Sequence, residues 1–221
     1  MQFLAGALVI GAALTATACT ARAQAAPPVT YVALGASDAV GVGAANPATD
    51  GWVPRFGARL GPNVHVVNLG VSGSTLSQAL EEQMSPALDA QPDLVTVWLA
   101  VNDLNARVPL DRYAADLDTL LGQLESTHAQ VLVGNVPDLA ALAAYRGVDP
   151  APLRADVDRW NAVIADTAAR HGDTLVDLYS HWQEVVQHPE YLSTDGFHPS
   201  SEGYQALAEV FSEALQTSAG A

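Results

Sequence analysis

Five short runs of apolar, mainly β-branched residues recur along the chain, and they predict five strands. The runs cover residues 29–34, 64–69, 94–99, 130–134 and 174–178. Their hydrophobicity is continuous rather than alternating, which is typical of strands buried on both faces of a sheet. The pattern therefore predicts a mostly parallel sheet that is covered on both sides.

Segments with apolar residues at helical spacing separate these runs. One stripe contains Leu110, Tyr113, Leu117, Leu120, Leu121 and Leu124, and another contains Val157, Trp160, Val163 and Ile164 and stops at Gly172. A last helix is expected to begin with a Ser cap at Ser200. Alternating strands and helices predict one flavodoxin-like, three-layer α/β/α domain with about five parallel strands over residues 26–221. In such sheets, ligands bind at the carboxyl ends of the strands.

The first 19 residues form an apolar run closed by small residues, of a length that suits a secretory signal better than a membrane span. Two processing sites are open. Cys19, in "ATAC", has the position of a lipidated bacterial cysteine with cleavage before it, and "AQA" permits ordinary cleavage after Ala25. We expect export, either as a cell-envelope lipoprotein with possible membrane attachment through Cys19 or as a secreted protein. Cys19 is the only cysteine, which excludes an intramolecular disulfide.

The charge of the chain argues against two classes of partner. Nine basic residues face 24 acidic ones, so the formal net charge is −15, which disfavours nucleic acid and anionic membrane surfaces. No cluster has the spacing of metal ligands, and we expect no metal and no cofactor.

The stretch "LGASDAVGVG" breaks the first predicted strand at Gly35. Its glycines do not fit the spacing of a dinucleotide-binding turn, and the chain has no Lys for a P-loop. Ser37 remains as a candidate nucleophile, and a serine hydroxyl needs a partner base.

His198 is the strongest candidate for that base because it lies in the turn-rich loop "STDGFHPSSEGY", three residues after Asp195. Asp195 could accept a hydrogen bond from one ring nitrogen of His198 and leave the other facing Ser37. The alternative is that Asp195 only caps a local turn and His198 is merely exposed. We expect surface or structural roles for the other histidines, which are His65, His128, His171, His181 and His188.

Four blocks together resemble the SGNH hydrolase family, also called GDSL esterases and lipases. They are "LGASDAVGVG" with Ser37, "VNLGVSGSTL" with Gly73, "LAVNDL" with Asn102, and "DGFHP" with Asp195 and His198. All four stand in family order. Two positions depart from the family pattern, because Ala36 replaces the acid before the serine and Ala100 replaces a glycine before Asn102.

The resemblance implies an exported serine esterase that acts through Ser37, His198 and Asp195 with an acyl-enzyme intermediate. The implied substrates are short-chain esters, lysophospholipids or acetylated carbohydrates. The implied oxyanion donors are the backbone N–H groups of Ser37 and Gly73 and the side-chain amide of Asn102. We attribute the glycine at 73 to a close backbone approach that leaves no room for a Cβ.

Other segments have expected places near the site. We expect Asp103 to brace its own loop by local hydrogen bonds. The stretches "GNVPDLAAL" and "AAYRGVDPAP" are expected to form a long apolar loop beside the site. Trp52 could line the pocket, although a core position is favoured. The alternative function is a non-catalytic, surface-anchored binding lipoprotein on the same fold, and the sequence predicts no oligomeric state.

Overall fold

The structure is a computed structural model that describes residues 28–185 and 187–219. The expected signal peptide, both of its processing sites and Cys19 lie outside these residues, and so do the first two residues of the predicted domain.

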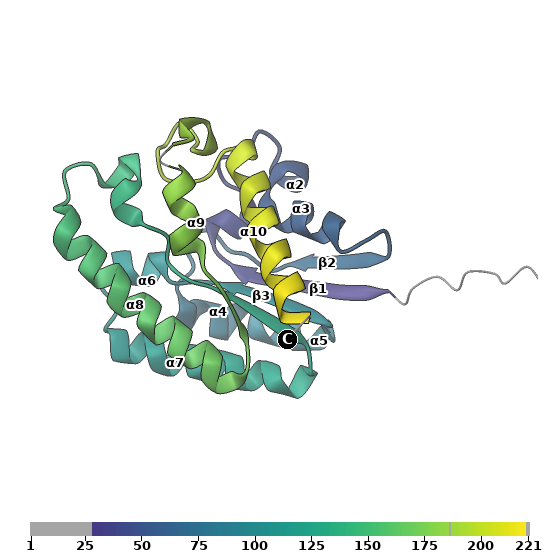
Figure 1. Ribbon diagram of the computed structural model, residues 1–221. Helices are drawn as coiled ribbons and strands as arrows, with labels where there is room; N and C mark the ends of the chain where they lie inside the picture. The colour runs from purple at the N-terminus through teal and green to yellow at the C-terminus, as the bar shows by residue number, and fades with distance from the viewer. Residues whose placement is uncertain (1–27, 186, 220–221) are drawn as a thin grey trace, which may run out of the picture.

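A single five-stranded sheet organises the described part of the chain (Figure 1). Its strands are β1 (Val29–Gly35), β2 (Val64–Asn68), β3 (Leu94–Trp98), β4 (Gln130–Gly134) and β5 (Thr174–Val176). They pair in the order β2-β1-β3-β4-β5, and every pairing is parallel. The predicted parallel α/β fold is confirmed, with each strand within two residues of its expected bounds.

Burial differs between the middle and the edges of the sheet. All five residues of β3 are buried, and so are most residues of β1 and β4. The edge strands β2 and β5 are only partly buried, so the expectation of burial on both faces was wrong for them. An edge strand has one neighbour instead of two, and helices cover it less completely.

Helices cover both faces of the sheet. They are α1 (Ser37–Val40), α2 (Pro47–Asp50), α3 (Trp52–Arg59), α4 (Leu76–Glu82), α5 (Met84–Asp89), α6 (Val101–Asn105), α7 (Leu110–Leu124), α8 (Pro150–His171), α9 (Leu178–Val185) and α10 (Ser201–Ala219). Short 3-10 turns, labelled η1 to η4, cover Glu125–Thr127, Leu139–Ala141, Ala143–Tyr145 and Pro189–Tyr191. In Figure 1, α3 and α10 lie on one side of the sheet and α4, α5, α7 and α8 on the other.

The predicted apolar stripes face the core. The α7 stripe is buried from Tyr113 to Leu124, with Leu110 partly buried at its start. Helix α8 ends at His171 and is capped by Gly172, whose φ of 75° is the left-handed conformation that glycine adopts at helix ends. The hydroxyl of Ser200 accepts a hydrogen bond from the backbone N–H of Gly203 at 3.2 Å, as expected for a cap of α10.

Trp52 belongs to the core. Its side chain is fully buried and stacks on Phe211 of α10 with ring centroids 4.3 Å apart. It also meets Trp98 of β3 edge to face at 6.2 Å. These aromatic contacts join α3 and α10 to the sheet, beneath the end that carries the candidate site.

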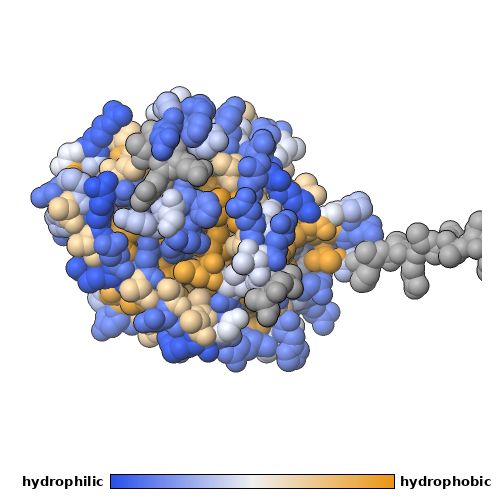
Figure 2. Space-filling view, viewed as in Figure 1, coloured by the Kyte–Doolittle hydropathy of each residue, from blue (hydrophilic) through white to orange (hydrophobic). Residues whose placement is uncertain are grey.

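The outer surface is mainly polar. Figure 2 shows hydrophilic residues over most of one face, with hydrophobic residues gathered in the hollows between them. Among the described helices, none combines the length and the hydrophobicity that are needed to cross a membrane.

Candidate active site

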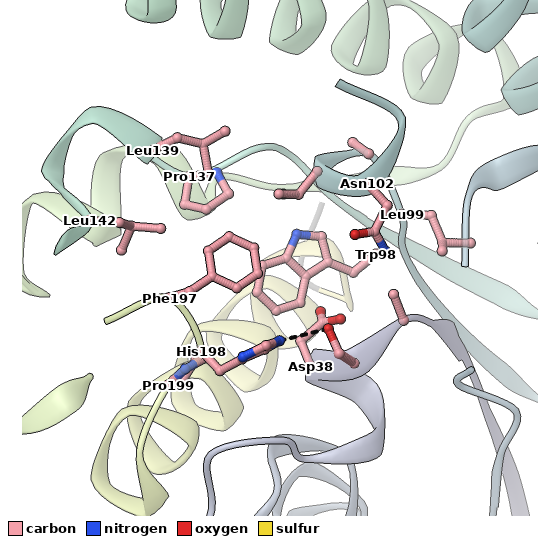
Figure 3. Close-up of a pocket in the computed structure, with 14 residues that line it drawn as sticks. Asp38, Trp98, Leu99, Asn102, Pro137, Leu139, Leu142, Phe197, His198 and Pro199 are labelled. Atoms are coloured by element: carbon pink, nitrogen blue, oxygen red, sulfur yellow. Dashed lines mark hydrogen bonds between the residues drawn. The ribbon is translucent and has the colours of Figure 1, made fainter. Parts of the chain in front are cut away.

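Three polar side chains from two distant segments meet at the carboxyl edge of the sheet. Ser37 is the first residue of α1, just after β1, and Asp195 and His198 lie in the loop between η4 and α10. The Oγ of Ser37 lies 2.8 Å from Nε2 of His198, and Nδ1 of His198 lies 2.6 Å from Oδ2 of Asp195. The dashed line in Figure 3 marks the bond between His198 and Ser37.

The partners of His198 determine where its ring proton lies. A carboxylate can only accept a hydrogen bond, so Nδ1 of His198 carries the proton and donates it to Asp195. Nε2 is then free to accept the hydrogen bond from the hydroxyl of Ser37. This tautomer is the one that a general base needs.

Asp195 is held as an anion by a dense set of donors. Its Oδ1 accepts from the backbone N–H groups of Phe197 and His198 and from the hydroxyl of Ser193, at 2.8 to 2.9 Å. Partial burial opposes ionisation, but the hydrogen bonds, first that from His198, outweigh it and hold the pKa of Asp195 well below its usual range. Asp195 therefore both shapes its turn and orients His198, so the two roles considered from the sequence coexist.

Gly43 allows the segment that follows Ser37 to touch the loop that carries His198. Its φ is +96°, and a Cβ at this position would lie 2.4 Å from the carbonyl oxygen of Pro199. The hydroxyl of Tyr204 also donates to the carbonyl of Val42 at 2.6 Å. Only a residue without a side chain permits this approach, which holds the two segments in contact.

Asn102 is the second residue of α6, and Gly73 lies in the turn before α4. The side-chain amide of Asn102 donates to the carbonyl of Ser74 at 2.9 Å, and its second N–H is left for another acceptor. Within the described residues, the backbone N–H groups of Ser37 and Gly73 have no hydrogen-bond acceptor. Asn102 lines the same pocket as Ser37, whereas Gly73 is exposed and does not line it.

The reason for a glycine at 73 differs from the expected one. A Cβ on Gly73 would meet no atom within 4 Å, so space does not require glycine there. Its φ of +83° does, because residues with a side chain rarely adopt that conformation.

Asp103 makes its side-chain hydrogen bonds to another element, α4. The expectation that it braces its own loop missed this contact. Its buried carboxylate accepts the backbone N–H of Leu76, the first residue of α4, at 3.0 and 3.2 Å from its two oxygens. Burial raises the pKa of Asp103 to about 6, and the bond from Leu76 offsets part of that rise. The loop that contains Gly73 is thus tied at Ser74 by Asn102 and at Leu76 by Asp103.

A mainly apolar pocket opens beside Ser37 and His198. Its empty volume is about 540 Å³, including the part that is open to solvent. The apolar lining comes from Ala36, Trp98, Leu99, Ala100, Val101, Pro137, Leu139, Leu142, Phe197 and Pro199. Figure 3 shows Phe197 and Trp98 among the side chains that line this pocket. Asp38 also lines it, and burial raises the pKa of this carboxyl to about 6.

The long loop after β4 forms one wall of the pocket, through Pro137, Leu139 and Leu142. Asp138 anchors this loop by an ion pair with Arg154 of α8 at 3.1 Å. The hydroxyl of Tyr145 donates to Oδ1 of Asn105 at 2.8 Å, which ties the far end of the loop to α6. The loop therefore lies beside the pocket, as the sequence predicted.

Several residues of the site were missed from the sequence. Trp98 and Phe197 look like ordinary core residues, Asp38 looks like a residue of a helix start, and Gln83 looks like a polar surface position. The sequence signal was weak, because a residue's neighbours across the sheet are not readable from its own segment.

Within residues 28–185 and 187–219, no group of three or more His, Cys, Asp or Glu side chains could hold a metal ion.

Comparisons with known proteins agree with this fold. An acetylxylan esterase from Geobacillus stearothermophilus is 24% identical over 155 residues, which cover 67% of this chain and 70% of that protein. Among solved structures, TesA superposes with a TM-score of 0.70 at 20% identity, covering 86% of this chain and 99% of TesA. LAE5, an α/β hydrolase from the metagenome of Lake Arreo in Spain, gives 0.69 at 23% identity, with 84% and 94% covered.

The sequence pattern of one family accounts for most of the chain. The pattern of the GDSL-like Lipase/Acylhydrolase family matches residues 33–206, which include Ser37, Gly73, Asn102, Asp195 and His198. Because this match spans well over half of the sequence, the chain belongs to the GDSL-like Lipase/Acylhydrolase family and is a hydrolase of ester bonds.

Proposed function

We propose that the protein is an exported serine esterase that acts through Ser37, His198 and Asp195 and forms an acyl-enzyme. The observation that carries the proposal is the unbroken hydrogen-bonded chain from Ser37 through His198 to Asp195. A serine, a base and an orienting carboxylate in this arrangement are the parts that acyl transfer needs.

In the proposed reaction, Oγ of Ser37 attacks the carbonyl carbon of the ester while its proton passes to Nε2 of His198. The tetrahedral intermediate collapses as His198 returns that proton to the leaving alcohol. Water then attacks the acyl-enzyme, again losing a proton to His198, which finally protonates Ser37 as the acid product leaves. The anionic Asp195 stabilises the imidazolium that forms in each half-reaction.

The oxyanion of each tetrahedral intermediate is proposed to lie between the backbone N–H groups of Ser37 and Gly73 and the amide of Asn102. The absence of an acceptor for these two backbone N–H groups within the described residues supports this role. A single preorganised donor of this kind lowers the barrier by about 3 to 4 kcal/mol.

The apolar pocket is proposed to hold the acyl group. Pro137, Leu139, Leu142 and Phe197 favour a hydrocarbon chain longer than acetyl. Each additional buried methylene contributes about 0.8 kcal/mol, which is roughly fourfold in kcat/KM. We expect p-nitrophenyl butyrate and hexanoate to be better substrates than the acetate, and acetylated xylan, the substrate type named for the relative, to be a poor one.

Labelling with a fluorophosphonate probe tests the nucleophile. The wild type should be labelled and Ser37→Ala should not, while ester turnover falls by roughly 10⁴- to 10⁶-fold in that variant. Absence of both labelling and ester turnover in the wild type would refute the esterase and support the alternative, a binding lipoprotein.

A panel of p-nitrophenyl esters tests the acyl pocket. Leu142→Trp should lower the preference for hexanoate over acetate, because the indole fills the apolar pocket. Val148→Trp is the matched control, since Val148 lies in the same loop but is half exposed and does not line the pocket. An unchanged chain-length profile in Leu142→Trp would contradict this assignment.

Export and attachment through Cys19 are part of the same proposal and rest on the sequence alone. Intact mass of the mature protein distinguishes the alternatives. A diacylated or triacylated N-terminal Cys19 supports the lipoprotein, and a start at Ala26 supports simple secretion.

A further inference from the structure

Gln83 is a buried polar residue that lies between the two halves of the site. It follows α4 and precedes α5, and only 1% of its surface is exposed. It does not line the pocket. A buried amide with no partner would cost stability, so its hydrogen bonds indicate what it does in this fold.

The first partner of Gln83 is the backbone of Gly35, two residues before Ser37. The N–H of Gly35 donates to Oε1 of Gln83 at 3.0 Å, and Nε2 of Gln83 donates to the carbonyl of Gly35 at 3.0 Å. The strand β2 has ended at Asn68, so this side chain supplies hydrogen bonds at the place where a further strand residue would do so. The last peptide of β1 before the turn of Ser37 is thereby fixed.

The second partner of Gln83 is Ser74, the residue after Gly73. Nε2 of Gln83 donates to the hydroxyl of Ser74 at 3.4 Å, and the carbonyl of Ser74 is the group that accepts from Asn102. The backbone N–H of Val71 also donates to the carbonyl of Gly35 at 3.2 Å. One amide thus connects the strand that ends in the serine turn with the loop that carries Gly73.

We infer that Gln83 is a positioning residue for acyl transfer, which holds the serine turn and the Gly73 loop at a fixed separation. The inference rests on the proposed function, because it assigns the attacking oxygen to Ser37 and an oxyanion donor to Gly73. The tetrahedral intermediate must meet both groups at once, so their relative position affects the transition state more than the bound substrate.

Steady-state kinetics of Gln83→Met with p-nitrophenyl butyrate test the inference. Methionine keeps the length of the side chain and removes its hydrogen bonds. We expect kcat to fall by roughly 10- to 100-fold, the scale of a displacement of about 1 Å in a site, with KM within about threefold of the wild type. Ser74→Ala removes only the weaker link and should lower kcat by roughly 3- to 10-fold.

Tyr31→Phe is the matched control for stability. It removes another buried hydrogen bond of β1, that between the hydroxyls of Tyr31 and Thr96 at 2.9 Å, at the opposite end of the strand from Ser37. Thermal unfolding of all variants is measured alongside the kinetics. Tyr31→Phe should keep kcat within about twofold of the wild type even where its stability loss equals that of Gln83→Met.

Several results overturn the inference. One is a Gln83→Met variant that keeps kcat within about twofold of the wild type, and another is an equal loss of kcat in Tyr31→Phe at matched stability. If Gln83→Met does not fold, an unchanged kcat in Ser74→Ala overturns it. A wild type without ester turnover and without labelling of Ser37 refutes the proposed function first, and a failure of that kind is distinguishable because every variant is then silent.

Discussion

His198 and His171 are both held by carboxylates, but they differ in what faces the second ring nitrogen. In His198, Nδ1 pairs with Asp195 and Nε2 faces the hydroxyl of Ser37. In His171, Nδ1 lies 2.6 Å from Glu125 and Nε2 lies 3.2 Å from Asp118. Because a carboxylate can only accept, both ring nitrogens of His171 must donate a hydrogen bond, which only the charged imidazolium can do.

The two carboxylates beside His171 favour its charged form. Burial disfavours the charge on His171, but the hydrogen bonds to Glu125 and Asp118 outweigh burial and raise the pKa of His171 above its usual value. The position of His171 at the carboxyl end of α8 also favours a cation. His171 is thus a structural ion-pair partner, as expected, whereas His198 keeps a nitrogen that can accept a proton. The two histidines differ in one partner: His198 has the hydroxyl of Ser37 where His171 has a second carboxylate. This difference makes His198 the candidate base.

The largest expected effect separates the two histidines by activity. His198→Ala should lower kcat/KM for p-nitrophenyl butyrate by roughly 10⁴- to 10⁶-fold, because Ser37 loses its base. His171→Ala should leave kcat/KM within about twofold, since His171 does not line the substrate pocket. A small loss in His198→Ala would remove the proposed mechanism.

The next effect changes only the orienting partner of His198. In Asp195→Asn, an amide N–H would face Nδ1 of His198, so the ring would carry its proton on Nε2 and could not accept from Ser37. We expect a loss of roughly 10²- to 10⁴-fold, smaller than that of His198→Ala. Circular dichroism should show an intact fold. A loss as large as that of His198→Ala would indicate that the whole loop had collapsed.

The dependence of activity on pH tests the same catalytic base. Because the pKa of Asp195 lies well below its usual range, its carboxylate stays ionised under mildly acidic conditions. We expect activity to fall on acidification because a protonated His198 cannot accept the serine proton. Asp38 and Asp103, whose pKa values burial raises to about 6, are other groups that gain protons in this range. An acid loss of activity that disappears in Asp38→Asn would assign the loss to Asp38 and contradict this interpretation.

A third effect tests how the loop of His198 is kept beside Ser37. Gly43→Ala would place a Cβ 2.4 Å from the carbonyl of Pro199 at a positive φ, so the two segments must move apart. We expect kcat to fall by roughly 10- to 100-fold. Gly61→Ala is the control, because Gly61 also has a positive φ but a Cβ there meets nothing within 4 Å. Equal kcat losses in the two variants would show that the contact with Pro199 is unimportant.

The smallest effect concerns stability around His171. A histidine whose pKa is raised by folding contributes stability that is fully present below its unfolded value of about 6.5, and this contribution is lost as the pH rises through the folded pKa. His171→Gln should thus be less stable than the wild type at pH 6 by at most about 1 kcal/mol, the scale of exposed ion pairs. The difference should vanish at alkaline pH. Urea denaturation at several pH values measures it, and a difference that grows toward alkaline pH would contradict the ion-pair assignment.

Local patterns were sufficient for much of the fold. The strands of 29–34 and 94–99 were readable because burial on both faces leaves an uninterrupted apolar run, and α7 because its buried stripe repeats at helical spacing. The edge strand β2 was read correctly in place but wrongly in burial, since the sequence does not say which strands have two neighbours.

Some residues of the site were predicted from the sequence and others were not. Ser37, Asn102, Asp195 and His198 stand in short blocks whose order is visible in the sequence. The role of Asp103 was misplaced because its partner, Leu76, lies 27 positions away. Gln83 gave no signal at all, because its partners Gly35 and Ser74 belong to other elements.

The sequence by itself determined the strands, their buried faces in the middle of the sheet, and the residue types that acyl transfer requires, since these depend on spacing within single segments. The sequence also favoured His198 over the other histidines as the base, but only the tertiary structure shows its ring in contact with Ser37, across 161 positions of sequence. The tertiary structure also decided that glycine is needed at 73 for its backbone angle and at 43 for contact with Pro199. Hydrogen-bond partners and close approaches depend on how the elements pack, and packing joins residues that no local pattern connects.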